Sequence, residues 1–569
     1  MCIESVIDVA RGKAPADILL KDALVVNVFT GEILKQSVAV KDGVVAGVGY
    51  YDRGEETFDL AGRYLIPGLI DAHIHIESSM LTPAAFAAEV VPHGVTTVVA
   101  DPHEIVNVAG LAGLDYMIKA SSGLPLDIFY MMPSCVPATN LETAGASVSK
   151  VEIDSFFKKH PRSPGLAEMM NYPGVCLKDQ AVLGKIRAAR ESRLVIDGHA
   201  PQLSGRDLNA YISTGITSEH ESVSAAEALE KLRLGMKIIM REGSAARNLI
   251  SILPIVTEKN CPNILFGCDD RSPADLVNEG EIDFVLRKAV SYGLDPVMAV
   301  QMATINPARH YNLPGLGAVA PGYRADLVVL PNLADFQAEM VFKEGVLVAR
   351  DNKLLAGLPA PEDKSVRNTV CLPELRGRFE LDVPAGKNLA RVIEVLPDQI
   401  LTRCVFVRPA ELTAAHDIAR VAVVERHGKN GNVAVGLVRG FRLENGAIAS
   451  TVAHDSHNLI IVGQSAGDME LAARTIAATG GGLAAVSGGK VLAALPLPLA
   501  GLISDQDARN VAAQHAELHK AAKKLGCTLP SPFMTMSFLA LPVIPELRIT
   551  DMGLVDANHF QLVDLWVRE

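Results

Sequence analysis

Hydrophobic and polar residues alternate along residues 17–66, in short runs that the turn sequences TGE and KDG interrupt. A period of two is typical of β-strands that bury one face and expose the other. The same alternation returns at residues 315–356, after a long stretch with a different pattern. We therefore expect residues 1–66 and 313–360 to form one composite β-sandwich domain from two distant parts of the chain.

Residues 67–312 show short apolar runs that alternate with stretches of helical periodicity. This pattern indicates βα units built around a parallel sheet. Eight units in about 250 residues predict a catalytic (β/α)8 TIM barrel, so the fold class is α/β. The eight runs, each followed by a candidate helix, are LIPGLIDAHIH, VTTVVADPHE, LDIFYMMPSCVP, PGLAEMMNYPG, RLVIDGHAP, GITSEHES, MKIIMREGS and NILFGCDD.

In nearly every unit the ionisable residues come only after the apolar run, at the carboxyl end of the expected strand. The active sites of such barrels lie at that end. The first run ends in His73-Ile74-His75, and residues two apart in a strand point to the same face. Two imidazoles side by side at the end of an apolar strand predict a metal site.

A proline-rich and charged stretch, AGLPAPEDKSVRN at 356–368, separates a third region from the barrel. Residues 365–569 mix strand-like runs such as NVAVGLVRGF and LIIVG with helical runs such as DMELAARTIAAT, which predicts a C-terminal α+β domain. The run Gly480-Gly481-Gly482 lacks the strand–loop–helix context of a phosphate-binding loop, so we interpret it as a turn.

Composition narrows the classes of partner. The net charge of −12 argues against nucleic acid, which needs a basic surface, and no segment approaches the about 20 apolar residues of a membrane-spanning helix. The N-terminus lacks the apolar core of a secretory signal, and the eight cysteines form no CxxC pair, so we expect reduced thiols in a cytoplasm. A small-molecule substrate and a homo-oligomer, dimer or tetramer, are expected.

Six strand-end groups would converge on one axis of a closed barrel. One catalytic metal usually keeps three protein ligands, so six suit two divalent ions that share a carboxylate and a water. Nitrogen and oxygen ligands without sulfur are compatible with Zn, Mn, Fe or Co. Asp269 has a neighbour, Asp270, and strand geometry lets only one of the two point inward without saying which. The six groups are His73, His75, Glu168, His199, His220 and Asp269.

This set of residues predicts metal-assisted hydrolysis. Divalent ions lower the pKa of bound water to about 7, and a carboxylate at the end of the eighth strand is well placed to move its proton to the leaving group. The reaction would release an amine or open an amide at an electrophilic carbon. The chain has no G-x-S-x-G, P-loop or H-E-x-x-H sequence, and His75-Ile76-Glu77 lacks the P-C-x-x-C partner of a cytidine-type zinc deaminase.

The motifs resemble those of the amidohydrolase superfamily and, more narrowly, of the bacterial adenine deaminases. The resemblance covers almost the whole chain. It implies hydrolysis of adenine to hypoxanthine and ammonia, in which a metal-bound hydroxide attacks C6, the ring nitrogen N1 is protonated and ammonia leaves. The motifs are IDAHIHIESSMLTP, HGVTTVVADPHEIVNVAG, GLAEMMNYPGV, DGHAPQLSG, TSEHES, REGSAARN and GCDDRSP, followed by VAHDSHNLIIVG, TGGGLAAVSGG and LPLPLAGLISD.

The resemblance also implies roles for single residues. Asp269 would complete the site of the first metal and act as a base, and Glu104 would transfer a proton or form a hydrogen bond, unless it is a structural acid. Glu168 would bridge the metals where many amidohydrolases have a carboxylated lysine. Mn or Fe is expected, with Zn as an alternative. His73 and His75 would bind one metal and His199 and His220 the other, and the candidates for purine contacts are Glu221, Arg241, Glu242 and Ser244.

Three alternatives stay open at this point. The substrate could be a cyclic amide or a different 6-substituted purine, which would keep the barrel and the metals. A scaffold that has lost its metals is disfavoured, because all six ligands are present. The sequence His454-Asp455-Ser456-His457-Asn458 could be a turn that satisfies its own backbone, or a loop that reaches over the barrel mouth.

Overall fold

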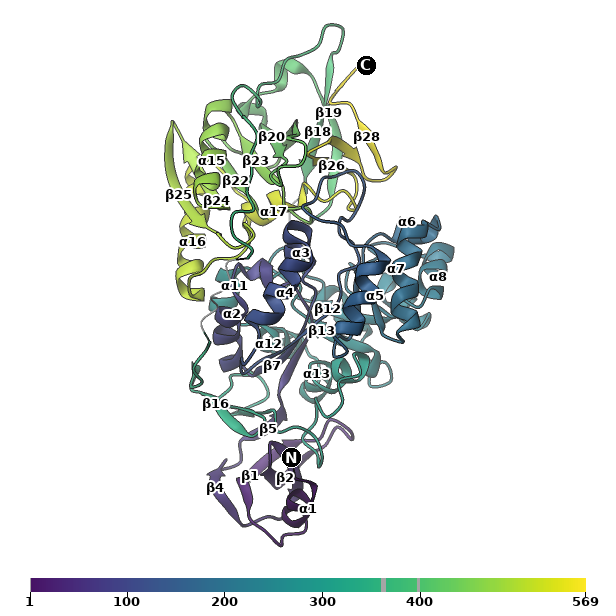
Figure 1. The fold of residues 1–569 in the computed structure, drawn as a ribbon, viewed down its shortest axis with the longest axis vertical. Helices are drawn as coiled ribbons and strands as arrows, with labels where there is room; N and C mark the ends of the chain where they lie inside the picture. The colour runs from purple at the N-terminus through teal and green to yellow at the C-terminus, as the bar shows by residue number, and fades with distance from the viewer. Residues whose placement is uncertain (1, 360–364, 397–399, 569) are drawn as a thin grey trace.

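The computed structural model describes residues 2–359, 365–396 and 400–568, so part of the predicted linker, residues 360–364, lies outside the described residues. Figure 1 shows a mixed α/β protein in which three bodies follow one another along the long axis. The N-terminal strands lie at one end, a body of strands and helices lies in the middle, and the C-terminal region lies at the other end.

Eight consecutive strands, β6 to β13, lie in the middle body and pair in parallel as β6-β7-β8, β9-β10 and β11-β12-β13. Single contacts join these sets, because Met132 bridges Leu166, the Thr217 amide donates to the Ile196 carbonyl, and Ile74 bridges Asp269. The last contact returns to β6, and we call this closed arrangement the eight-strand ring. The strands are β6 Leu69–Ile74, β7 Val95–Ala100, β8 Asp127–Tyr130, β9 Gly165–Met169, β10 Val195–Gly198, β11 Ser218–Glu219, β12 Lys237–Arg241 and β13 Ile264–Gly267.

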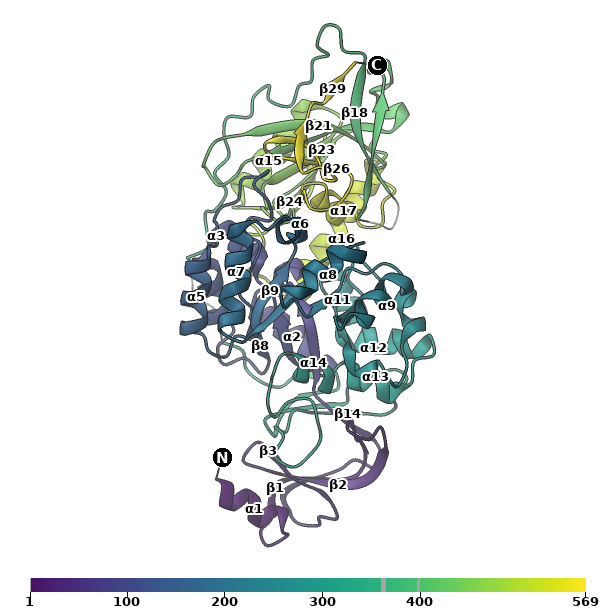
Figure 2. The same cartoon turned by 90° about the vertical axis from the view of Figure 1, so that its right-hand side faces the viewer.

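Helices follow the ring strands and cover their outer side, as Figure 2 shows for α5, α7, α9 and α12. Several begin at a side chain that accepts hydrogen bonds from free backbone N–H groups. Asp179, for example, accepts from the amides of Ala181 and Val182. The helices are α2 Pro83–Val90, α3 His103–Ala109, α4 Leu111–Ala120, α5 Lys150–Lys159, α6 Tyr172–Cys176, α7 Gln180–Glu191, α8 Gly205–Ser213, α9 Ala225–Arg233, α10 Leu249–Ile252, α11 Pro273–Glu279, α12 Ile282–Ser291, α13 Pro296–Met302 and α14 Ile305–His310.

The two alternating segments that flank the ring share one nine-stranded sheet, in which β5 pairs antiparallel with β14. Helix α1, Ile3–Ala10, packs beside β2 and β3. The two segments are hydrogen-bonded into one continuous sheet, and the composite β-sandwich domain stays a prediction. Its strands are β1 Ala16–Val26, β2 Ile33–Lys41, β3 Val44–Gly49, β4 Gly54–Asp59, β5 Tyr64–Pro67, β14 Leu327–Leu330, β15 Met340–Lys343, β16 Val346–Arg350 and β17 Lys353–Leu354.

The sequence LIPGLIDAHIH, interpreted above as one strand, is two. Residues before Gly68 belong to β5 of the terminal sheet, and residues after it belong to β6 of the ring. A Cβ atom on Gly68 would lie 2.2 Å from Oγ1 of Thr96, so the chain can cross from one sheet to the other only where the side chain is absent. The single-strand interpretation was wrong because both halves are equally apolar.

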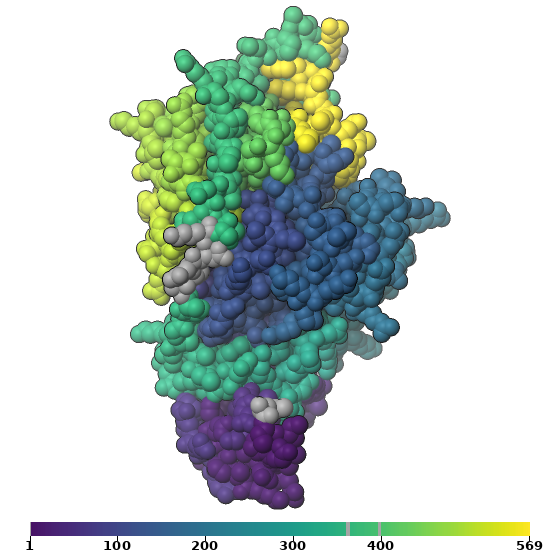
Figure 3. Space-filling view, viewed as in Figure 1, coloured from purple at the N-terminus to yellow at the C-terminus, as the bar shows by residue number. Residues whose placement is uncertain are grey.

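The C-terminal region has a nine-stranded sheet, a three-stranded sheet and three helices. Figure 3 shows it packed directly on the middle body. Its strands and helices are interspersed along the chain. They are β18 Leu389–Val395, β19 Thr402–Val407, β20 Ile418–Val424, β21 Val433–Arg439, β22 Ala447–Ser450, β23 Leu459–Gly463, β24 Gly482–Ser487, β25 Lys490–Pro496, β26 Leu547–Thr550, β27 Gly553–Asp556, β28 Gln561–Val563 and β29 Trp566–Val567, with α15 Ala466–Ala478, α16 Ala508–Lys524 and α17 Pro532–Phe538.

Gly480 and Gly481 lie in the turn between α15 and β24, as interpreted from the sequence. Among the described residues, no helix is both long enough and apolar enough to cross a membrane.

Candidate metal centre

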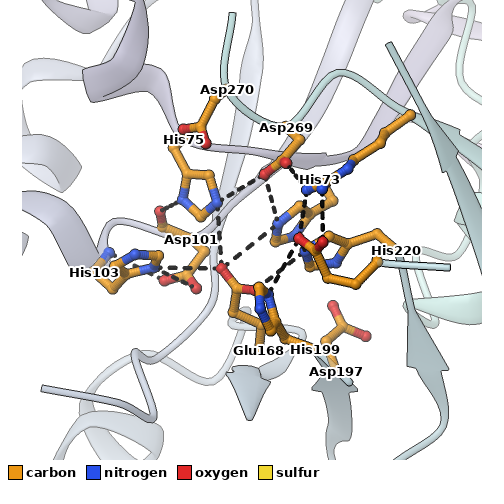
Figure 4. Close-up of polar contacts among 12 residues, drawn as sticks. His73, His75, Asp101, His103, Glu168, Asp197, His199, His220, Asp269 and Asp270 are labelled. Carbon is orange, nitrogen blue, oxygen red and sulfur yellow. Dashed lines mark hydrogen bonds and ion pairs between the residues drawn. The ribbon is translucent and has the colours of Figure 1, made fainter. Parts of the chain in front are cut away.

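The six strand-end groups meet in one cluster at the carboxyl ends of the ring strands, as Figure 4 shows, and all of them except His73 line one cavity. Their side chains come from β6, β9, β10, β11 and β13 or from the first residues after them. Each of the six is between 2 and 6 % exposed. Burying this many ionisable groups together is costly unless they are paired or bind an ion.

Glu168 stands at the middle of the cluster and presents one oxygen to each half. Its Oε1 lies 3.3 Å from Nε2 of His75 and 3.8 Å from Nε2 of His73. Its Oε2 lies 2.8 Å from Nδ1 of His199 and 3.2 Å from Nε2 of His220. This is the placement that a carboxylate needs to bridge two ions.

Asp269 closes the first half of the cluster. Its Oδ1 lies 3.1 Å from Nε2 of His75 and 3.5 Å from Nε2 of His73, and the three groups could share one ion. His75 donates from Nδ1 to the backbone carbonyl of Asp101 at 3.0 Å. That hydrogen bond fixes the neutral ring in the tautomer whose Nε2 is free to bind a metal.

The donor set fits two divalent cations. Nε2 of His73 and Nε2 of His199 are buried and make no hydrogen bond within the described part of the chain. A buried imidazole nitrogen without a partner costs free energy, and a bound ion would remove that cost. Several histidine-and-carboxylate groups have ligand atoms close enough to hold an ion, among them His73, His75 and Asp269; His73, Glu168 and His220; and His199, His220 and Glu221.

The electrostatics of the cluster also favour cations. Burial lowers the pKa of His220, but the carboxylate of Glu168 outweighs it and raises that pKa to about 10. Burial raises the pKa of Glu168, but His220 and His199 outweigh it and hold that pKa well below its usual range. The carboxylates therefore keep positive charge beside them, and without metal that charge is a proton. A divalent ion can replace such protons, so metal binding should release them.

Both Asp269 and Asp270 line the cavity, so the expectation that only one could point inward was wrong. Asp269 has a left-handed backbone conformation, with φ of 59°. The alternation of side chains along an extended strand ends at such a residue. Asp269 faces the histidines, whereas Asp270 accepts a hydrogen bond from Oγ of Ser78 at 2.5 Å.

The four candidates for purine contacts divide into two pairs. Glu221 and Arg241 line the cavity, and Arg241 Nη2 donates to Glu221 at 2.7 Å while Nη1 contacts Asp269. Glu242 lies outside the cavity lining and pairs with Lys288. Ser244 also lies outside it and donates to Asp275 at 2.5 Å. Substrate contact by any of the four stays a prediction.

Glu104 is buried under the C-terminal region, at the start of α3. Nδ1 of His454 lies 2.7 Å from one of its oxygens, and Nε2 of His457 contacts the other. Burial raises the pKa of Glu104, but His454 and His457 outweigh it and hold that pKa well below its usual range. Glu104 is therefore an ionised carboxylate held by two imidazoles from a different part of the chain.

The loop at 454–458 reaches over the ring, because His454 and Asp455 line the cavity. The interpretation as a turn whose Asp and Asn satisfy their own backbone was wrong, since Asn458 accepts from the Arg426 amide and donates to the Thr143 carbonyl. The backbone of the loop is instead satisfied through His457, whose Nδ1 accepts from the Ala453 amide.

Sequence reasoning missed several groups at the cavity. Asp101 and His103 follow β7, and His103 Nδ1 donates to Asp101 at 3.0 Å. The rule that polar residues at strand ends are functional could have found them, because they stand in the same ADPHE sequence as Glu104. No such signal marks the apolar residues that close the cavity from above, namely Ile400, Phe538, Leu541 and Ile544.

Known proteins resemble this chain along its whole length. Residues 64–348 match the amidohydrolase family, and residues 400–561 match the adenine deaminase C-terminal domain. The chain is 49 % identical to the adenine deaminase of Desulfatibacillum aliphaticivorans over 573 aligned residues, which cover 100 % of both chains. It is also 49 % identical to adenine deaminase 2 of Carboxydothermus hydrogenoformans over 569 residues, which cover 99 % of each.

Proposed function

This chain belongs to the adenine deaminases of the amidohydrolase superfamily, and we propose that its cluster of six strand-end ligands performs their reaction with two divalent metal ions. The enzyme hydrolyses adenine to hypoxanthine and ammonia. The eight-strand ring and its helices form the catalytic (β/α)8 barrel in this proposal, with the terminal sheet and the C-terminal region as further domains. A dimer or tetramer in the cytoplasm stays a prediction.

Bound ions would supply one kind of chemistry, which is to lower the pKa of water to about 7 so that a nucleophile exists at neutral pH. His73, His75 and Asp269 would hold one ion, and His199 and His220 the other, with Glu168 between them. Manganese or iron is our expectation, and zinc is the alternative, since a set of nitrogen and oxygen donors suits all three.

The protein's own groups carry the protons. Burial raises the pKa of Asp269, but Arg241 and the nearby histidines together outweigh it and hold that pKa well below its usual range, so Asp269 is ionised and can accept a proton from water. It would then return that proton to the departing amino group. Burial lowers the pKa of His454, but Glu104 and nearby aspartates outweigh it and raise that pKa to about 9, so His454 can supply the proton that Glu104 would carry to ring nitrogen N1. The proton of the hydroxyl group on C6 would return to His454 as ammonia leaves.

The placement of Glu168, with one oxygen on each half of the cluster, is the observation that carries the two-metal proposal. The test is to strip the protein of metal and titrate Mn²⁺ back while ammonia release from adenine is measured. We expect activity to rise until two ions are bound per chain. Saturation at one ion per chain would contradict the bridging role of Glu168.

Substrate controls belong in the same experiment. Guanine and cytosine should release no ammonia, and dihydroorotate should not be hydrolysed to its ring-opened product, because the relatives over the full length are adenine deaminases. Turnover of dihydroorotate in place of adenine would contradict the assignment of adenine as the substrate and would favour a cyclic amidase.

A further inference from the structure

The C-terminal region forms a wall of the catalytic cavity that faces the metal centre. The wall contributes His454 and Asp455 to the cavity, together with apolar side chains. The ring of His454 stacks on that of Phe538, with centroids 4.7 Å apart and an angle of 14° between the planes. The wall is thus apolar except at two adjacent residues.

Both of those residues carry a polar atom without a partner. His454 and Asp455 are each 2 % exposed, and Nε2 of His454 and Oδ2 of Asp455 make no hydrogen bond to any residue that the structure describes. A buried carboxylate oxygen left without a donor costs free energy. This cost is recovered if the molecule that fills the cavity brings an N–H group to Asp455.

The imidazole ring of His103 lies between Asp455 and Glu168 of the metal centre. Nδ1 of His103 lies 3.7 Å from Oε1 of Glu168, and Nε2 of the same ring lies 3.7 Å from Oδ1 of Asp455. One imidazole with a contact on each side therefore separates the two carboxylates. A purine lying alongside His103 would place its six-membered ring at the centre and its five-membered ring toward Asp455.

We propose that Oδ2 of Asp455 accepts the imidazole N–H of adenine, at N9 or N7, and so makes this enzyme select the free base over nucleosides and other 9-substituted purines. The inference rests on the proposed function. In adenine the reacting carbon C6 and the N–H group lie on different rings, which matches a metal centre and an acceptor on opposite walls. A 9-substituted purine has no N–H at N9, and its substituent would press against the buried wall.

The test compares adenine with 9-methyladenine in Asp455→Ala and Asp455→Asn variants. We expect kcat/KM for adenine to fall about ten- to a hundredfold in Asp455→Ala, because a hydrogen bond to a charged group is lost. The value for 9-methyladenine should change little, so the preference for adenine should fall by the same factor. Asp455→Asn should show a smaller loss, because its amide oxygen can still accept.

A matched control is Asp551→Asn, an acid-to-amide change in the same region. Asp551 is buried, accepts from the Thr143 amide and Asn432, and does not line the cavity. Any change in kcat/KM caused by this variant should be the same for adenine and 9-methyladenine. If Asp455→Ala also lowers kcat/KM by the same factor for both substrates, Asp455 only supports the wall and the inference is overturned.

Calorimetric binding to metal-free protein gives a readout that does not need turnover. Hypoxanthine should bind more tightly than 9-methylhypoxanthine to the wild type, and Asp455→Ala should remove the difference. Equal binding of the two ligands by the wild type would overturn the inference. Failure of the wild type to release ammonia from adenine would instead contradict the proposed function, so the two failures are distinguishable.

Discussion

The two faces of the catalytic cavity are built in opposite ways. The ring face, from the strand ends of β6 to β13, is polar and holds six ligand groups. The cap face, from the C-terminal region, is mostly apolar, and its polar groups come from one loop, residues 454–458. In the proposed function the ring face would perform the hydrolysis, while the cap face would orient the substrate, exclude water and position Glu104.

The largest expected effect is on the ring face. Glu168→Gln removes the negative charge between the two halves, and we expect activity to fall on the order of a thousandfold and at least one metal ion per chain to be lost. Metal analysis and ammonia release measure both effects. Glu142→Gln is the matched control, since Glu142 is equally buried but lies outside the cavity lining. Full metal content in Glu168→Gln would contradict the bridging role.

A smaller effect is expected where the faces meet. His457→Asn removes one of the two imidazoles that hold Glu104, and we expect kcat to fall about ten- to a hundredfold while both metal ions stay bound. Glu104→Gln should lower kcat further, about a hundredfold or more, because general acid–base catalysis would be lost. If His457→Asn also releases metal, the separation between ring face and cap face is wrong.

The smallest effect concerns the stability of the folded protein and involves Glu142, which accepts a hydrogen bond from Ser456 of the 454–458 loop. Burial raises the pKa of Glu142 to about 8 from the ordinary 4.5, although the hydrogen bond from Ser456 opposes it. Between these pH values the folded protein keeps a proton that the unfolded chain has released, so the free energy of unfolding falls as pH rises. Glu142→Gln should remove this fall, which is on the order of a few kcal/mol.

Thermal unfolding at pH 5.5 and pH 8.5 checks this prediction. The unfolding temperature of Glu142→Gln, measured relative to wild type, should be higher at pH 8.5 than at pH 5.5. A difference that does not change with pH would mean that Glu142 is ionised in the folded protein.

The ring face could be predicted from the sequence because strand ends carry a readable pattern. His73 and His75 stand two residues apart after an apolar run, and Glu168, His199 and His220 each follow such a run. Since parallel strands end at the same edge, their convergence follows from topology alone. The same reasoning failed for Asp270, because a left-handed residue before it breaks the alternation on which the reasoning depends.

The cap face could not be predicted in the same way. Phe538 and Ile544 look like any other core residues, and nothing in their local periodicity tells which distant surface they cover. His454 and His457 stood out as polar residues, but their partner Glu104 lies about 350 positions away in the chain. Contacts at such sequence separation depend on the complete fold, because no local interaction specifies them.

The order of these faces along the chain also sets the order in which a ribosome makes them. All six ring ligands lie between residues 73 and 269, and the loop of the cap begins at residue 454. At ordinary rates of synthesis the intervening chain takes on the order of tens of seconds to emerge. During that interval the nascent chain carries a complete set of ligands with no cap above it. Ions can therefore reach their binding site before the protein that will enclose them has been finished.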